Sequence, residues 1–280
     1  EMGADASRIT QACVDEVAAS LAILRRPWPG SQMRRGVNAR AFLLGYFREL
    51  IPARRTGNGD DMFSQFCKAE SEEGAFFNDD EIIDHLNFLL MAAHDTTTSA
   101  LTTMIWALAQ YPEWQDAVRA EVMAVGSDQL SYDDLYKLEL TERVLKEALR
   151  YRPPVPFLPR YAEHSFEFGG YEIPGETSVT VSPGLVAMDP AWWTHPGRFD
   201  PDRFSDNRAE DRGHRFAWTP FGGGAHKCIG MHFAIMQVRA FLHQFLQQFQ
   251  IALPVSYQDR WQAIPIPKPK DGLPVILSRF

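Results

Sequence analysis

Residues 221–230 read Phe-Gly-Gly-Gly-Ala-His-Lys-Cys-Ile-Gly, and this stretch decides how the whole chain is interpreted. It contains one cysteine, Cys228, between glycine-rich turns and a following apolar run that is typical of a helix. Glycines let a backbone lie close to a flat group, and the start of a helix favours the negative charge of a thiolate. Cys228 is therefore poorly placed for a disulfide and well placed to act as a ligand. The alternative is a buried, unreactive structural cysteine at a loop–helix junction.

Four residues of this stretch also follow a known spacing. Phe221, Gly224, Cys228 and Gly230 match F-x-x-G-x-x-x-C-x-G, and the stretch resembles the haem-ligand loop of the cytochrome P450 family. The resemblance implies that the Cys228 thiolate is the axial ligand of the iron in haem b, iron protoporphyrin IX. It also implies that His226 contacts a haem propionate, with a solvent-facing loop histidine as the alternative.

A second segment, residues 92–97, reads Ala-Ala-His-Asp-Thr-Thr at the end of an apolar pattern with helical spacing. It resembles the signature [A/G]-G-x-[D/E]-T-[T/S] in the family's long oxygen-binding helix. The resemblance implies that Asp95 and Thr96 are an acid–alcohol pair that supplies protons to dioxygen, which binds near Ala92 and Ala93. Ala93 stands where most members have glycine, which narrows the oxygen groove by a methyl group. The alternative is that the hydroxyls here only bond back to helix carbonyls.

The third and fourth segments belong together. Glu147 and Arg150 are spaced i, i+3 and can pair on one helix face, although such a pair alone is weak evidence. Residues 196–204, Pro-Gly-Arg-Phe-Asp-Pro-Asp-Arg-Phe, resemble the family's P-x-x-F-x-P-x-R-F segment. The resemblance implies that Arg203 joins Glu147 and Arg150 in a buried triad behind the haem loop. That triad has a structural role and no catalytic one.

Several further residues have an expected contact and a plainer alternative. Arg160 lies where the family often has another propionate partner, but an exposed arginine is the alternative. Lys227 and Lys146 are expected on a positive face that docks an acidic ferredoxin. The alternative is that they are scattered, solvated lysines. The expected apolar substrate contacts are Phe88, Leu89, Ala92, Val155 and Phe157. The alternative is that these are ordinary core residues.

Composition favours one globular body. The 280 residues are 45% hydrophobic and 23% charged, without an evident linker or repeat, so we expect a single haem domain over residues 1–280. The net charge of −8 argues against nucleic acid as a partner. Three widely spaced cysteines suggest a reducing compartment, and no apolar run reaches membrane-spanning length. We therefore expect a cytoplasmic protein, although an upstream segment could carry an anchor.

The expected fold class is mainly α with small β-sheets, the C-terminal part of the cytochrome P450 fold. In the family a substantial block precedes the segment that resembles this chain, so we expect its N-terminal part to be missing. A stripe of Ile9, Val14, Val17, Ala18 and Leu21 marks the first helix, and Gly169-Gly170 marks a hairpin. The expected helices are 5–25, 35–52, 79–110, 112–126, 141–151 and 229–248, with a strand at 177–181 and strand-like segments over 250–280.

The resemblance implies a haem-thiolate monooxygenase that inserts one atom of dioxygen into a C–H bond of a lipophilic small molecule. Electrons would come from a separate ferredoxin or flavodoxin, because the chain contains no flavin or iron–sulfur segment. The alternatives are a peroxide-using or isomerising haem-thiolate enzyme, which the Asp95–Thr96 pair disfavours, and a truncated non-catalytic remnant. Residues 233–237 are similar to bacterial members near the sterol 14α-demethylase branch. That branch has His where this chain has Asp95, and many members have Glu in place of Gln237.

Overall fold

The fold is that of a computed structural model, which describes residues 5–20, 22, 24–126, 130–263 and 266–280. The chain forms two compact units, residues 1–95 and residues 96–280, which are described separately below. The expectation of one haem domain over the whole chain stays a prediction. Within the described ranges, no helix is both long and apolar enough to cross a membrane.

Unit 1 consists of α1 (Ala6–Ser20), α2 (Gln32–Thr56), α3 (Met62–Lys68) and the first half of α4 (Asp79–Gln110). Gly36 lets α1 and α2 approach closely, because a Cβ there would lie 2.1 Å from the Cβ of Ala19. The buried side chains between the helices are Ile9, Ala12, Cys13, Ala39, Leu43, Phe47, Ile51, Cys67, Ile82, Ile83 and Leu86.

The sequence placed the ends of two of these helices differently. α1 ends at Ser20, and Leu21 of the predicted stripe lies outside the described residues. α2 begins at Gln32, where the hydroxyl of Ser31 accepts a hydrogen bond from the Arg34 amide, and it continues beyond Pro52. The helix therefore begins before the expected residue 35 and ends after the expected residue 52, with Pro52 inside it.

Unit 2 contains the second half of α4, α5 (Pro112–Val125), α6 (Glu139–Tyr151), α7 (Pro183–Val186) and α8 (Met231–Gln248). Short 3₁₀ turns lie between them: η2 (Asp133–Lys137), η3 (Pro201–Phe204), η4 (Glu210–Arg212) and η5 (Gly224–His226). The main core lies between α4, α5, α6 and α8 and includes Met104, Leu108, Val118, Val122, Leu145, Ala148, Leu242 and Leu246.

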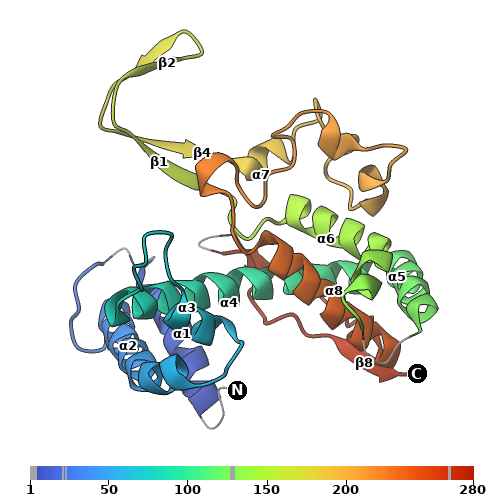
Figure 1. The fold of residues 1–280 in the computed structure, drawn as a ribbon. Coiled ribbons are helices and arrows are strands. Elements are labelled where there is room, and N and C mark those ends of the chain that lie inside the picture. Colours follow the sequence, from blue (N-terminus) through green and yellow to red (C-terminus); the bar gives the residue numbers. More distant parts are fainter. Residues whose placement is uncertain (1–4, 21, 23, 127–129, 264–265) are drawn as a thin grey trace. The chain divides into compact units, whose positions relative to one another are not determined.

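The strands of unit 2 form small antiparallel pairs, which confirms a mainly helical fold with small sheets. β1 (Leu158–Ala162) pairs with β4 (Thr177–Val181), and β2 (Phe166–Phe168) pairs with β3 (Tyr171–Ile173) at the far end of that ribbon (Figure 1). Gly169 and Gly170, both with positive φ, make the predicted hairpin turn. The remaining pairs are β5 (Phe249–Ala252) with β8 (Ile276–Arg279) and β6 (Trp261–Gln262) with β7 (Lys268–Pro269).

Candidate functional site

The loop that carries Cys228 is a tight turn closed by its own backbone. The Cys228 amide donates a hydrogen bond of 2.9 Å to the carbonyl of Phe221, and the Lys227 amide donates one of 3.2 Å to that of Gly224. Gly222 and Gly224 have φ angles of +70° and +66°, in the left-handed region that favours glycine. Gly222 and Gly224 are therefore needed to form the turn, in addition to allowing a close approach of its backbone.

Cys228 presents its thiol at the surface, three residues before α8 begins. It is exposed, whereas Cys13 and Cys67 are buried. Burial raises the pKa of Cys13 to about 11 and also raises the pKa of Cys67, so neither buried thiol readily becomes a thiolate. Cys228 is thus not the buried structural cysteine of the alternative interpretation.

The surface beside the Cys228 thiol fits a flat, largely apolar group. Ile229 is 87% exposed and Phe233 is 59% exposed, although both are large apolar side chains. A Cβ added at Gly224 would meet no atom within 4 Å, so the backbone is uncovered there. Exposed apolar side chains that follow the thiol in the sequence are what a haem could cover. His226, exposed in the same loop, is accessible to a propionate.

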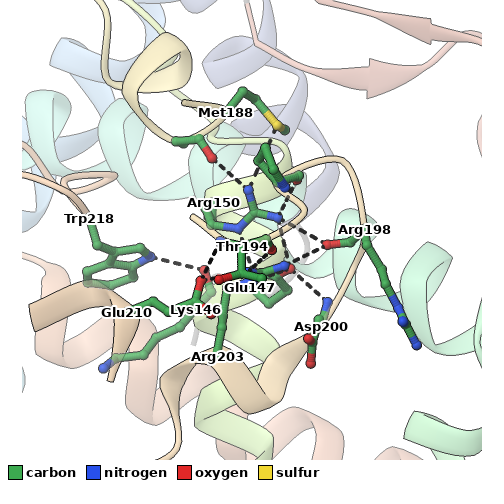
Figure 2. Close-up of polar contacts among 12 residues, drawn as sticks. Lys146, Glu147, Arg150, Met188, Thr194, Arg198, Asp200, Arg203, Glu210 and Trp218 are labelled. Carbon is green, nitrogen blue, oxygen red and sulfur yellow. Dashed lines mark hydrogen bonds and ion pairs between the residues drawn. The ribbon is translucent and has the colours of Figure 1, made fainter. Parts of the chain in front are cut away.

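Glu147, which precedes this loop in the sequence, lies at the centre of a buried ion-pair network (Figure 2). Arg150 Nε lies 2.7 Å from Glu147 Oε2, and Arg203 Nε lies 3.1 Å from Glu147 Oε1. The Asp200 amide donates a further hydrogen bond of 2.8 Å to Oε1. All three charged side chains are at most 1% exposed. The structure therefore brings together Glu147, Arg150 and Arg203, the residues that the sequence grouped as a triad.

The two arginines of this network also hold backbone from distant segments. Arg150 donates to the carbonyls of Ala187 at 2.6 Å and Pro196 at 2.8 Å, and Arg203 donates to that of Thr194 at 2.9 Å. A guanidinium has five N–H donors in a fixed plane, so one side chain can satisfy several carbonyls at once. The network thereby fixes the irregular segment between α7 and η3 against α6.

Two members of the network were missed by the sequence analysis. Glu210 accepts hydrogen bonds from Arg203 at 2.8 Å and from Arg208 at 2.6 Å. Burial alone would raise the pKa of Glu210, but the hydrogen bonds from Arg208 and Arg203 lower it overall. Burial raises the pKa of Glu147, and Arg150 and Arg203 oppose that rise. No motif covers Glu210 or Arg208, so spacing alone gave no signal for them.

A row of aromatic rings connects this network with the cysteine loop. The ring centroids of Trp193 and Phe204 are 5.7 Å apart, those of Phe204 and Trp218 6.2 Å, and those of Trp218 and Phe221 5.9 Å. The indole Nε1 of Trp218 also donates a hydrogen bond of 3.1 Å to the carbonyl of Lys146 on α6. Packing from α6 thus extends to the first residue of the loop.

Asp95 and Thr96 lie partly buried on α4, which is continuous through the motif. Asp95 Oδ1 lies 2.8 Å from Nδ1 of His94. Consecutive helix residues usually point apart, so this contact identifies His94 as a partner that the sequence analysis missed. Ala92, one turn before Thr96, is also partly buried. The proton-supplying role of the Asp95–Thr96 pair stays a prediction.

The hydroxyls that follow on α4 have mixed partners. Thr102, which lies beyond the motif, donates to the carbonyl of Thr98 at 2.7 Å, as helix hydroxyls often do. Ser99 instead donates to the carbonyl of Pro267 at 2.6 Å. That bond ties unit 2's part of α4 to the C-terminal segment, so hydroxyls of this region do more than bond back to their own helix.

The charged residues expected near the cofactor differ in their surroundings. Arg160 lies exposed on β1, and its Nη1 donates to the carbonyl of Pro159 at 2.8 Å. Lys227 is exposed, but the Lys146 ammonium pairs with Asp211 at 3.0 Å. The Lys146 charge is therefore neutralised by Asp211, from a distant 3₁₀ turn, and the positive docking face with Lys227 stays a prediction.

The expected apolar substrate contacts are not fully buried. In unit 1, Phe88 is exposed, and Leu89 and Ala92 are partly buried. In unit 2, Val155 and Phe157 are exposed. None of the five belongs to the fully buried core of its unit, and their role as substrate contacts stays a prediction.

A family model for cytochrome P450 matches residues 7–271, nearly the whole chain. The chain therefore belongs to the cytochrome P450 family, which confirms the family resemblance of its sequence. Haem binding is the property that membership implies, and the exposed Cys228 loop fits it.

Individual relatives agree with this assignment. The chain is 38% identical to cytochrome P450 136 of Mycobacterium tuberculosis over 272 residues, which cover 97% of this chain and 55% of that protein. It is 35% identical to cyclooctatin synthase of Streptomyces melanosporofaciens over 76% of this chain and 44% of that protein. It is 32% identical to sterol 14alpha-demethylase of Mycolicibacterium vanbaalenii over 71% of this chain and 45% of that protein. The chain thus spans about half the length of these relatives.

The structural comparison gives the same result. Cyanobacterial CYP120A1 with bound retinoic acid superimposes with a TM-score of 0.92 at 28% sequence identity, over 99% of this chain and 64% of the other. The expected fold class is confirmed by this match.

Proposed function

We propose that this chain is part of a haem-thiolate monooxygenase that inserts one atom of dioxygen into a C–H bond of a lipophilic small molecule. The observation that carries the proposal is the exposed Cys228 thiol in a glycine turn beside exposed Ile229 and Phe233. Membership of the cytochrome P450 family supports the same conclusion.

Each residue of the loop has a proposed part in holding the cofactor, haem b. A haem with a cysteine thiolate ligand supplies the electron-rich iron that activates dioxygen. Cys228 would be that ligand, and the start of α8 favours its negative charge. Phe221, Gly224 and Gly230 shape the loop, and His226 and Arg160 would bind the propionates.

Asp95 and Thr96 are proposed to control protons. The Thr96 hydroxyl would position a water or the bound oxygen by a hydrogen bond, and the Asp95 carboxylate would resupply the proton. His94 Nδ1, at 2.8 Å from Asp95 Oδ1, would orient that carboxylate. This relay favours dioxygen-dependent turnover over the peroxide-using or isomerising alternative.

The substrate class and the electron donor are proposed from broader arguments. Phe88 in unit 1, and Val155 and Phe157 in unit 2, are exposed apolar side chains of the kind that a lipophilic substrate contacts. Retinoic acid, which is bound in the similar CYP120A1 structure, is itself lipophilic. We propose a separate ferredoxin or flavodoxin as the electron donor, which the exposed Lys227 would face. We also propose a cytoplasmic location, where such a donor would be available.

The test is the absorption spectrum of the reduced, carbon-monoxide-bound protein, recorded for this chain and for the longest form that its gene encodes. We expect a red-shifted Soret band that Cys228→Ser abolishes and Cys67→Ala retains, because Cys67 is buried elsewhere. A band that survives Cys228→Ser would overturn the ligand assignment. No band in either form would favour a non-catalytic remnant, and turnover with peroxide but not with an electron donor would favour the peroxide-using alternative.

A further inference from the structure

A hollow in the surface of unit 2 lies at the β6–β7 hairpin and the segment before it. Its volume is 440 Å³, within the range of about 300–1,000 Å³ that is usual for small-molecule sites. The residues that line it include Pro254, Tyr257, Arg260, Lys270 and Pro274. None of these residues belongs to the motifs around Cys228, Asp95 or Glu147, so the family interpretation assigns no part to this hollow.

The wall of the hollow holds two cations side by side. The Lys270 amide donates a hydrogen bond of 2.9 Å to the Arg260 carbonyl. This bond extends the antiparallel β6–β7 pairing by one step beyond Trp261 and Pro269. Residues directly opposite one another in such a pair project from the same face, so the two charged side chains are neighbours. Like charges in this arrangement destabilise a hairpin, and an anion between them would relieve the repulsion.

Neither cation is neutralised by a residue that the structure describes. The Arg260 guanidinium donates to the side chain of Gln258, which is uncharged. Within the described part of the chain, Lys270 and Arg260 form no ion pair. Asp271 also lines the hollow, but its Oδ1 accepts a hydrogen bond of 3.1 Å from the Leu273 amide. The lining thus has two positive charges and one negative charge, in a protein whose net charge is −8.

Buried donors without an acceptor lie in the same part of unit 2. The Tyr257 hydroxyl is buried and donates to no residue that the structure describes, and the same holds for Arg152 Nη1 and Trp106 Nε1. The Arg152 guanidinium carbon lies 3.8 Å from the centroid of the Trp106 ring. Burial raises the pKa of Tyr257 and the charge of Arg152 opposes that rise, so the hydroxyl lies within the influence of this guanidinium. A group with several acceptor oxygens would match such a gathering of donors.

The two sides of the hollow are held in shape by their own backbone. On one side, the Tyr257 amide donates a hydrogen bond of 2.9 Å to the Pro254 carbonyl. On the other, Leu273 is only 8% exposed and has a φ of +56°, in the left-handed region that leucine rarely adopts. A residue keeps such a conformation only where its surroundings hold it, and such residues are often found beside bound ligands. The hollow is therefore already formed before any ligand enters it.

We infer that this hollow binds a small organic anion, with its phosphate or carboxylate group between Arg260 and Lys270. The guanidinium offers such an oxyanion two parallel donors, and the Tyr257 hydroxyl would donate to the same group. The rings of Tyr257, Pro254 and Pro274 would lie against an apolar part of the ligand, which an inorganic ion lacks. The site is independent of the proposed oxygenation, because none of its residues is proposed to hold haem or to supply protons.

The experiment is calorimetric titration of the longest form that the gene encodes with phenyl phosphate, benzoate and inorganic phosphate. We expect phenyl phosphate or benzoate to bind, and the tighter of the two identifies the oxyanion. Benzyl alcohol, which has the ring without the charge, should not displace it. Arg260→Gln/Lys270→Gln should weaken binding about a hundredfold, since each charge-assisted hydrogen bond contributes about tenfold. The control Arg198→Gln/Arg215→Gln removes the same charge from exposed positions of unit 2 and should bind as the parent does.

Two further measurements separate binding from stability. Without bound ligand, Arg260→Gln/Lys270→Gln should melt no lower than the parent, because it removes the repulsion between opposed cations. Tyr257→Phe keeps the ring and should weaken binding about tenfold, with an unchanged melting temperature because the hydroxyl donates to no described residue.

Four outcomes would overturn the proposal. The first is that neither phenyl phosphate nor benzoate binds. The second is inorganic phosphate that binds as tightly as phenyl phosphate, which would indicate an adventitious ion only. The third is equal affinity in the two double variants, since general electrostatic attraction would then suffice. The fourth is an affinity of Tyr257→Phe equal to that of the parent, which would place the ligand elsewhere.

Discussion

The indole Nε1 of Trp218 donates a hydrogen bond of 3.1 Å to the backbone carbonyl of Lys146, the residue directly before Glu147. This bond joins the segment that leads into the Cys228 loop to the helix that carries the central carboxylate of the ion-pair network. The Trp218 ring also lies against Phe221 on one side and Phe204 on the other. The position of the cysteine loop therefore depends on one side chain that no sequence motif includes.

Trp218→Phe tests this link, because it keeps most of the ring packing and removes the N–H donor. The Lys146 carbonyl loses its side-chain donor, so we expect the free energy of unfolding to fall by about 1–2 kcal/mol. Urea denaturation monitored by circular dichroism measures the change. Trp192→Phe, at a tryptophan that is 41% exposed, is the control and should change little. Equal losses in the two variants would show that the hydrogen bond has no special importance.

Glu147→Gln tests the buried ion-pair network. The substitution preserves shape but leaves two buried guanidinium groups, Arg150 and Arg203, without their shared counter-charge. Breaking a buried ion pair in this way costs about 3–5 kcal/mol, which is a large part of the stability of a typical domain. We expect a strongly lowered melting temperature and a poor yield of folded protein. Glu139→Gln, at an exposed position of the same helix, should be nearly neutral, and similar melting of both variants would contradict the structural role.

The burial of His243 predicts that the free energy of unfolding depends on pH. It is fully buried on α8, with its Nδ1 3.0 Å from the Gln247 amide. Burial lowers the pKa of His243 below its ordinary value of 6.5, although the charge of Asp134 opposes that shift. The unfolded chain therefore takes up a proton near pH 6.5 that the folded protein excludes. The contribution of His243 to the free energy of unfolding is complete above that pH and is lost as the pH falls below it.

His243→Gln should remove this part of the pH dependence, because glutamine can still bond to Gln247 but does not titrate. Urea unfolding at several pH values between about 7 and 5 measures the slope, over the range in which histidine normally titrates. His85→Gln replaces an exposed histidine and should leave the slope unchanged. A slope that is the same in His243→Gln and in the parent would exclude His243 as its source.

Thr96→Ala tests the proposed proton supply in the complete enzyme with its electron donor. Without the hydroxyl, electrons should still be consumed, but they should reduce dioxygen to peroxide instead of supporting formation of the product. A positioned proton-transfer group raises the reaction rate on the order of a hundredfold, so the rate of product formation should fall by about that factor. The measurement is the ratio of product to peroxide for each electron pair consumed. Thr98→Ala, at an exposed position on the same helix, is the control, and an unchanged ratio in Thr96→Ala would remove the relay.

Much of the fold could be predicted because its signals are local. The helix at Asp79–Gln110 has the predicted bounds, since an apolar period of 3.6 residues and the Tyr111–Pro112 stop are both visible in sequence. The strand Leu158–Ala162 was not predicted. The strand Leu158–Ala162 itself contains Pro159, and a proline normally argues against a strand. Its partner, Thr177–Val181, lies beyond the whole intervening hairpin.

The sequence by itself determined the family, the candidate ligand Cys228 and the grouping of Glu147 with Arg150 and Arg203, because each depends on motifs with residue types at short, fixed spacings. Tertiary structure alone decided which thiol is accessible and that the Lys146 ammonium is taken by Asp211. It also decided that Trp218, 72 positions along the chain from Lys146, holds the loop to α6. The physical reason is that burial and pairing depend on which distant segments meet, and no local spacing records those meetings.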